Sequence, residues 1–255
     1  MKELRRFLIA LGYFTRLPIP AWVGWSSSEL NRATRYFPLV GLVVGSVSAA
    51  VLWAALQFWS PAIAVLLSML VSLLLTGAFH EDGLADSADG FGGGWEKAKV
   101  LAIMKDSRIG TYGASALLTA LMLKFAALQA LGSAALLALP VVHAASRVPP
   151  LLIMAFMTYV REDDNTRAKP VAEGLRIAEW LTGSLLGLAP LLAGCALGGF
   201  TPLCCLALLA GLALAGLLCA RYFRQRIGGY TGDALGAAQQ VCELTAYLIL
   251  CSSIT

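Results

Sequence analysis

The amino-acid sequence predicts an all-α membrane protein, a polytopic transmembrane helical bundle of about seven spans. Three observations predict this fold: the composition, seven long apolar stretches, and an alternation between connections without Lys or Arg and charged connections. Hydrophobic residues fill 58% of the 255 positions and charged residues only 13%, and the mean hydropathy is +0.75. A soluble domain is about half apolar and a quarter charged. The bilayer is therefore the expected solvent of this chain.

Seven apolar stretches are long enough, or nearly so, to cross about 30 Å of hydrocarbon. They run roughly over 37–58, 62–79, 112–131, 134–157, 180–198, 202–220 and 238–255. The last is the weakest, because Glu243 lies inside it. No Pro-rich or low-complexity linker separates the stretches, so we expect a single integral-membrane domain over 1–255.

The connections between these stretches alternate in charge. Those after the first, third and fifth stretches are short and contain no Lys or Arg, whereas the others and the N-terminal segment are charged. Cytoplasmic loops of membrane proteins collect Lys and Arg, which predicts a multi-pass protein with its N-terminus and its charged connections in the cytoplasm. We interpret the net charge of +4 in the same way. No basic stripe with interleaved aromatic residues predicts a nucleic-acid partner.

The first 20 residues have a basic start followed by a short apolar run. Such a segment is either a signal peptide or an amphipathic helix in the membrane interface. No small-residue cleavage site follows it, because the next residues read TRLPIP. This favours an interfacial helix over a signal peptide.

The segment after the second stretch is rich in carboxylates, with Asp82, Asp86 and Asp89 spaced i, i+4, i+7. On a helix these three side chains share one face. Carboxylates so close repel one another unless a cation lies between them, and oxygen ligands beside a phosphate substrate favour Mg²⁺. The alternative is a solvated acidic face. We expect a magnesium site here, and with it an active site at the cytoplasmic face.

Two further polar segments adjoin apolar stretches on the same side. In the first, Lys105 and Arg108 are candidates to bind a diphosphate, and Asp106 either to ligate metal or to orient Arg108. The alternative is ordinary anchoring by positive charge. In the second, glycines break a helix and Asp233 opens the next one. Its candidate phosphate-binding residues are Gly228, Gly229 and Thr231. We expect Asp233 to join the Asp82 cluster in one site.

Several ionisable residues lie inside apolar stretches. A charge near the bilayer centre costs about 2.5–3.5 kcal/mol, so such residues usually face the bundle interior and have partners. Lys124 and Arg147 are therefore candidate substrate ligands, with snorkelling to the interface as the alternative. His143 lies one turn before Arg147, either in the same cavity or as a core histidine. Glu243 is a functional candidate for the same reason as Lys124.

The motifs HEDGLADSADG, KDSRIGTYG and GGYTGDALGAAQQ, with FTRLPIP and RYFPLVG upstream, closely resemble the bacterial cobalamin synthase family. The resemblance runs in order from about Phe14 to Glu243. It implies a magnesium-dependent enzyme of the bacterial cytoplasmic (inner) membrane that joins adenosylcobinamide-GDP to α-ribazole or its 5′-phosphate and releases GMP. It also implies that the phosphorus next to the corrinoid is attacked, with Asp233, His80 or Glu243 accepting the proton of the nucleophile. The segment from Arg161 to Arg176 matches no motif of the family.

Two alternative functions remain at the level of sequence. A CDP-alcohol phosphotransferase also uses several aspartates at the cytoplasmic face, and its motif is close to 82–86, although the expected arginine is missing. An ion-coupled transporter needs polar groups on both sides of the membrane, which the bare outer loops argue against. A homo-oligomer is compatible with the sequence.

Overall fold

The fold is all-helical over the described residues of this computed structural model, which are 1–24, 26–161 and 175–253. No β-strand occurs among them. The helices are α1 (Lys2–Phe14), η1 (Ala21–Val23), α2 (Ser27–Ala33), η2 (Thr34–Tyr36), α3 (Phe37–Ala55), α4 (Pro61–Thr76), α5 (Phe79–Gly93), α6 (Lys97–Ile103), α7 (Thr111–Leu131), η3 (Gly132–Ala134), α8 (Ala135–Ala145), α9 (Val148–Phe156), α10 (Ile177–Ala196), α11 (Pro202–Ile227) and α12 (Gly232–Ser253).

The ends of the apolar helices follow from their sequences. Proline opens α4 and α11, where the missing N–H is not needed. The Thr201 hydroxyl accepts a hydrogen bond from the Cys204 N–H at 3.1 Å and so caps α11. Gly228 ends α11 in the left-handed conformation, at φ +77°. All seven predicted stretches are helical, but α11 continues to Ile227 and α12 begins earlier than expected, at Gly232.

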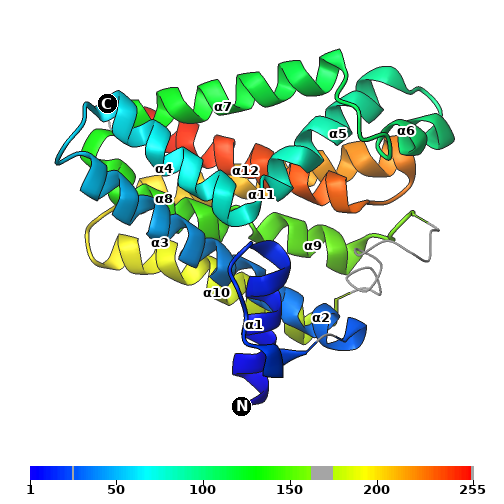
Figure 1. The fold of residues 1–255 in the computed structure, drawn as a ribbon, viewed down its shortest axis with the longest axis horizontal. Helices are drawn as coiled ribbons and strands as arrows, with labels where there is room; N and C mark the ends of the chain where they lie inside the picture. Colours follow the sequence, from blue (N-terminus) through cyan, green and yellow to red (C-terminus); the bar gives the residue numbers. More distant parts are fainter. Residues whose placement is uncertain (25, 162–174, 254–255) are drawn as a thin grey trace.

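Five helical stretches of the described chain are long and apolar enough to cross a membrane, or six if the bent pair α4 and α5 counts as one span. They are Ser28–Ala55, Thr111–Phe156, Ile177–Ala196, Pro202–Ile227 and Gly232–Ser252. The longest reverses direction at η3, so that α7 and the α8–α9 pair run in opposite senses (Figure 1). This result confirms a multi-pass helical protein but not the predicted count of seven spans.

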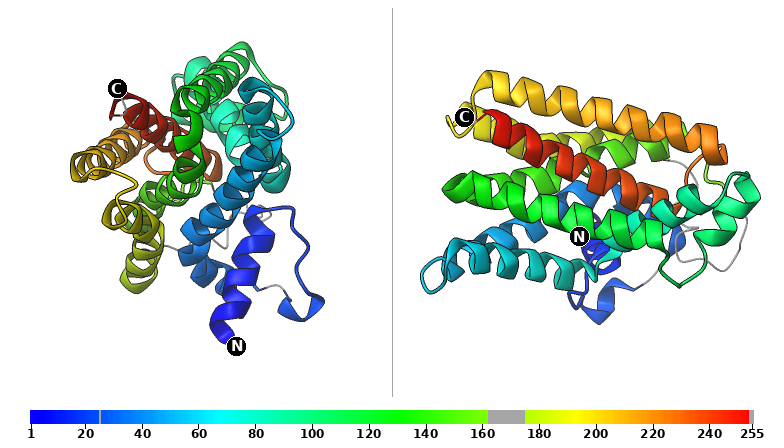
Figure 2. Two further views of the ribbon diagram at one scale, coloured as in Figure 1. Left: turned by 90° about the vertical axis from the view of Figure 1, so that its left-hand side faces the viewer. Right: turned by 90° about the horizontal axis from the view of Figure 1, so that it is seen from above.

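The two ends of the bundle differ in their connections. The loops after α5, α9 and α11 gather at the end drawn on the right of Figure 1. The short connections after α3, α7 and α10 gather at the opposite end, together with the end of α12 (Figures 1 and 2). We call the first the polar end, because it carries the charged loops. The alternation seen in the sequence thus corresponds to two opposite faces of the molecule.

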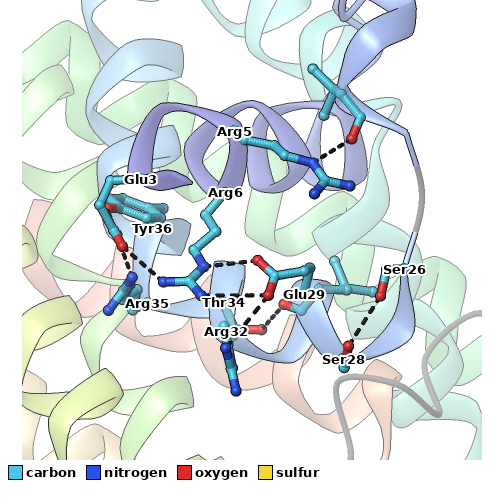
Figure 3. Close-up of polar contacts among 12 residues, drawn as sticks. Glu3, Arg5, Arg6, Ser26, Ser28, Glu29, Arg32, Thr34, Arg35 and Tyr36 are labelled. Carbon is cyan, nitrogen blue, oxygen red and sulfur yellow. Dashed lines mark hydrogen bonds and ion pairs between the residues drawn. The ribbon is translucent and has the colours of Figure 1, made fainter. Parts of the chain in front are cut away.

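Helix α1 runs across the bundle rather than along it (Figure 1). Ion pairs fasten it to α2 and η2 (Figure 3): Arg6 contacts both Glu29 and Glu3 at 2.8 Å. Glu3 also pairs with Arg35. Farther along α1, Ile9 and Phe14 are buried in a cluster that includes Phe37 and Val40 of α3. The helix expected within residues 1–20 therefore exists, and its place in a membrane interface stays a prediction.

A sharp break separates α4 from α5. Two consecutive residues, Gly77 and Ala78, have positive φ values of 64° and 55°, and the two helix axes differ by 85°. Arg16 lies against Gly77, so that a side chain there would collide with the guanidinium. Beyond the break, α5 carries four carboxylates in fifteen residues and extends toward the polar end (Figure 1). We therefore treat α5 as a polar helix outside the membrane-spanning segments.

Helices α5 and α12 meet backbone against backbone. A Cβ atom on Gly83 would lie 2.8 Å from the Asp233 carbonyl oxygen and 3.2 Å from the Cα of Gly236. A Cβ on Gly236 would lie 3.2 Å from the His80 carbonyl oxygen. Small residues allow such an approach between helices in a membrane protein. The contact brings the acidic face of α5 beside the first turn of α12.

Replacing Gly83 by Ala should lower the melting temperature of the purified protein in detergent. The added methyl meets backbone that cannot move aside cheaply, and overpacking of this kind costs about 1–3 kcal/mol. Gly93→Ala is the matched control on the same helix, because the nearest atom there is the Ile103 Cδ1 at 3.2 Å, the tip of a flexible side chain. Equal melting temperatures for the two variants would contradict the close contact.

Candidate active site

A cleft of about 480 Å³ opens at the polar end between α5, the segment after α6, and the start of α12. Its lining combines acidic and basic side chains. The lining residues are Asp82, Asp86, Met104, Lys105, Asp106, Ser107, Arg161 and Asp233. Sequence segments that lie more than a hundred residues apart therefore meet in one site, as predicted for Asp233 and the Asp82 cluster.

Two carboxylates of α5 line this cleft. Asp82 is exposed and Asp86, one turn later, is half-buried. Burial, together with the carboxylates of Asp233 and Asp82, raises the pKa of Asp86 to about 7. Crowded carboxylates of this kind hold a proton or a cation between them.

Asp233 reaches the same cleft from the first turn of α12. The Thr231 hydroxyl caps this helix by accepting a hydrogen bond from the Ala234 N–H at 3.1 Å. The Asp233 carboxylate pairs with Arg161, whose guanidinium also donates to the Met104 carbonyl at 3.3 Å. Thr231, predicted to bind phosphate, is thus fully buried and serves as a helix cap. Arg161 is a cleft residue that sequence reasoning missed.

A short backbone bridge holds Arg161 in place. The Tyr230 N–H donates to the Thr158 carbonyl, and the Val160 N–H donates to the Tyr230 carbonyl, both at 3.0 Å. Gly229 permits this bridge, because a side chain there would collide with the Thr158 carbonyl. The predicted role of Gly229 in phosphate binding is untested, and its visible role is packing. The only sequence signal for Arg161 was its place among the charged loops.

Asp89 is engaged away from the cleft. Its two carboxylate oxygens accept hydrogen bonds from the Gly110 N–H at 2.6 Å and the Gly113 N–H at 2.8 Å. These N–H groups belong to the start of α7, which a carboxylate stabilises. Two of the three predicted metal ligands therefore line the cleft, and the third joins α5 to α7. A metal-binding role for Asp89 stays a prediction.

In the segment before α7, Asp106 and Arg108 pair with each other, with Arg108 Nη2 2.6 Å from Asp106 Oδ2. The neighbouring guanidinium lowers the pKa of Asp106 to about 2. The Arg108 side chain is 87% exposed and does not line the cleft, whereas Lys105 does. Asp106 thus orients Arg108, which is one of the two roles expected for it.

A buried polar network lies deeper in the bundle. Lys124 of α7 pairs with Glu243 of α12, and Gln239 donates to the same carboxylate at 2.6 Å. His143 Nε2 lies 3.6 Å from Glu243. Each of these side chains is nearly inaccessible to solvent. Lys124 and Glu243 face the bundle interior, as predicted, but they neutralise each other rather than line the cleft.

Hydrogen bonds extend this network to α5, the helix that carries four carboxylates. Gln240 donates to Glu81 at 3.1 Å and to Gln239 at 2.9 Å, which joins α12 to α5 next to Asp82. Arg147 is 1% exposed, and its guanidinium lies over the Phe37 ring.

His80 stacks on the Phe37 ring at 5.5 Å and lies outside the cleft. The catalytic role predicted for His80 and the substrate contact predicted for Arg147 remain predictions.

The donor set decides what kind of metal site fits. No group of three or more His, Cys, Asp or Glu side chains in the described chain converges closely enough to hold an ion by itself. Mg²⁺ is usually bound by one or two carboxylates, together with waters and substrate phosphates. Asp82 and Asp86 beside Lys105 and Arg161 fit that open arrangement. The residues therefore suit a magnesium–phosphate complex rather than a closed protein cage.

Removing the Glu243 charge should destabilise the protein, because Glu243→Gln leaves the Lys124 ammonium buried without a counter-charge. Breaking a buried pair in this way costs about 3–5 kcal/mol, whereas replacing both partners by apolar residues is often neutral. Glu243→Gln should therefore lower the melting temperature in detergent, and Lys124→Met combined with Glu243→Leu should restore most of it. An unchanged melting temperature with lost turnover would instead support a chemical role for Glu243.

Comparison with known proteins identifies the family. A family model described as cobalamin-5-phosphate synthase matches residues 6–251. The adenosylcobinamide-GDP ribazoletransferase of Shewanella sp. (strain W3-18-1) is 49% identical over 254 residues, covering 98% of this chain and 94% of the relative. The protein of that name in Leptothrix cholodnii is 47% identical, covering 96% and 94%. No solved structure matches. The chain belongs to the cobalamin-5-phosphate synthase family, which confirms the resemblance in its sequence motifs.

Proposed function

We propose that this protein is a magnesium-dependent adenosylcobinamide-GDP ribazoletransferase whose active site is the cleft at the polar end, in the cytoplasm. The names of its relatives support the substrates. One observation carries the assignment of the site: Asp82, Asp86 and Asp233 line a single cleft together with Lys105 and Arg161. Carboxylates and cations side by side suit a metal-bound diphosphate. The charged loops at this end support a cytoplasmic location by the positive-inside rule.

The reaction exchanges one phosphorus–oxygen bond for another. A ribose hydroxyl of α-ribazole, or of its 5′-phosphate, attacks the phosphorus attached to the corrinoid, and a 5′-phosphate, where present, is retained in the product. The bond from that phosphorus to the bridging oxygen breaks, and the bridging oxygen leaves with GMP. With either acceptor, the proton of the attacking hydroxyl must also be removed. Positioning and charge stabilisation are the main demands that such a transfer makes on a protein.

Different cleft residues would hold the metal ion, stabilise charge and accept the proton. Asp82 and Asp86 would hold Mg²⁺, which supplies neutralisation of the diphosphate and the leaving phosphate. Lys105 and Arg161 would contact the same oxygens and stabilise the charge that develops in the transition state. Of the three proton acceptors expected from the sequence, only Asp233 lines the cleft. As Arg161 turns to the diphosphate, the carboxylate of Asp233 is released to accept the proton.

The function is tested in oriented membrane vesicles. Inside-out vesicles supplied with adenosylcobinamide-GDP, α-ribazole and Mg²⁺ should release GMP and a cobalamin product, because the cleft then faces the medium. EDTA should abolish the reaction and added Mg²⁺ should restore it. Sealed right-side-out vesicles should be inactive until they are permeabilised. CMP release from a CDP-alcohol without GMP formation would instead support a CDP-alcohol phosphotransferase. Equal activity in both sealed preparations would contradict the cytoplasmic site.

Asp86 and Asp233 should act as a unit. Asp86→Asn and Asp233→Asn should each lower turnover on the order of a hundredfold or more. The double variant should be similar to the worse single variant, because residues of one site are strongly non-additive. Glu96→Gln removes an exposed carboxylate that does not line the cleft and should leave turnover unchanged. Losses that multiply would mean that the two aspartates act independently.

A further inference from the structure

A second cleft, of about 540 Å³, adjoins the first at the polar end. Lys105 and Arg161 line both clefts, so the two share a border. The remaining lining of the second cleft comes from α6 and from the segment after α9: Lys97, Ala98, Leu101, Ala102 and Val160. A group attached to a diphosphate in the first cleft can therefore extend directly into the second.

The second cleft is basic. Lys97, Lys105 and Arg161 line it, and no carboxylate does. Lys97 reaches toward the turn between α11 and α12, where its Nζ lies 3.7 Å from the position of a Cβ on Gly228. Lys97, a residue of the second cleft, is therefore close to the turn predicted from the sequence to bind phosphate, although Gly228 and Gly229 line neither cleft. Three cations from two segments of the chain favour an anionic ligand.

One wall of the second cleft is apolar. Ala98, Leu101 and Ala102 follow the spacing i, i+3, i+4 and so share one face of α6. Val160 adds a further apolar side chain. Small-molecule sites have volumes of about 300–1,000 Å³ and combine apolar surface with a few charged groups. The size, the charge and the apolar wall together fit a ring attached to a sugar phosphate.

We propose that this basic cleft binds the nucleoside 5′-monophosphate portion of a substrate, with Lys97 as a phosphate ligand and the apolar face of α6 against the base. The inference rests on the proposed function for the identity of the nucleotide. Two substrate portions have this chemistry: the guanylate of the activated corrinoid and α-ribazole 5′-phosphate. In the first case, Lys97 and Lys105 also stabilise the charge that GMP acquires as its bond to the corrinoid phosphorus breaks.

The test measures nucleotide binding by titration calorimetry on the purified full-length protein in nanodiscs, with GMP as the probe. Lys97→Ala should weaken GMP binding about tenfold or more, the loss expected when a hydrogen bond to a charged group is removed. Lys99→Ala is the matched control, because Lys99 is an exposed lysine of the same helix that lines neither cleft. Lys97→Arg should retain most of the affinity, and all three variants should keep the wild-type melting temperature.

A parallel titration with α-ribazole 5′-phosphate distinguishes the two sources. A loss confined to GMP assigns the cleft to the guanylate, and a loss confined to the ribazole phosphate assigns it to the nucleophile. Unchanged affinity for both nucleotides in Lys97→Ala, or equal losses in Lys97→Ala and Lys99→Ala, would overturn the proposal. Because binding needs no turnover, nucleotide affinity without product formation would overturn the proposed function alone.

Discussion

The backbone contact between α5 and α12 is the constraint on which the candidate active site depends. Gly83 and Gly236 let the two helices approach until a Cβ on either would meet main-chain atoms of the other. Asp82 and Asp233 flank this contact, so the distance between the two acidic helices is set by main-chain packing rather than by the mutual repulsion of their carboxylates. The hydrogen bond from Gln240 to Glu81 fixes the register of the same pair. In a membrane protein such close packing supplies much of the association energy between helices.

The buried network beneath the cleft explains how ionisable residues are accommodated in apolar helices. A charge inside the bilayer is costly unless it has a partner. Lys124 and Glu243 neutralise each other, and Gln239 and Gln240 carry the hydrogen bonding on to α5. Support of this kind keeps reacting groups in a fixed geometry, which transfer of a phosphate-linked group requires. The network therefore connects the apolar bundle to the chemistry at its polar end.

Charges of opposite sign are divided between different elements at the polar end. The carboxylates of the cleft come mainly from α5 and α12, and the cations from α6 and the segments after α6 and α9. Arg161 pairs with Asp233 and borders both clefts. A diphosphate with its metal ion carries charges of both signs and so matches this division. The same residues that keep the cleft electrically balanced without a substrate can exchange partners when one binds.

The sequence by itself determined the helical membrane fold, the two unlike ends and the family, because apolar length, loop charge and ordered motifs are properties of consecutive residues. It also predicted that Asp82, Asp86, Lys105 and Asp233 belong to one site, and these four residues line one cleft. Only the tertiary structure decided which candidates meet. Asp89 accepts hydrogen bonds from the backbone of α7, Glu243 pairs with Lys124, and Thr231 caps its own helix. Arg161, from a segment without a motif, lines the cleft and pairs with Asp233. Which side chains pair depends on where the helices cross, as α5 and α12 do at Gly83 and Gly236. The spacing of residues along one helix does not encode the distance to a residue on another helix.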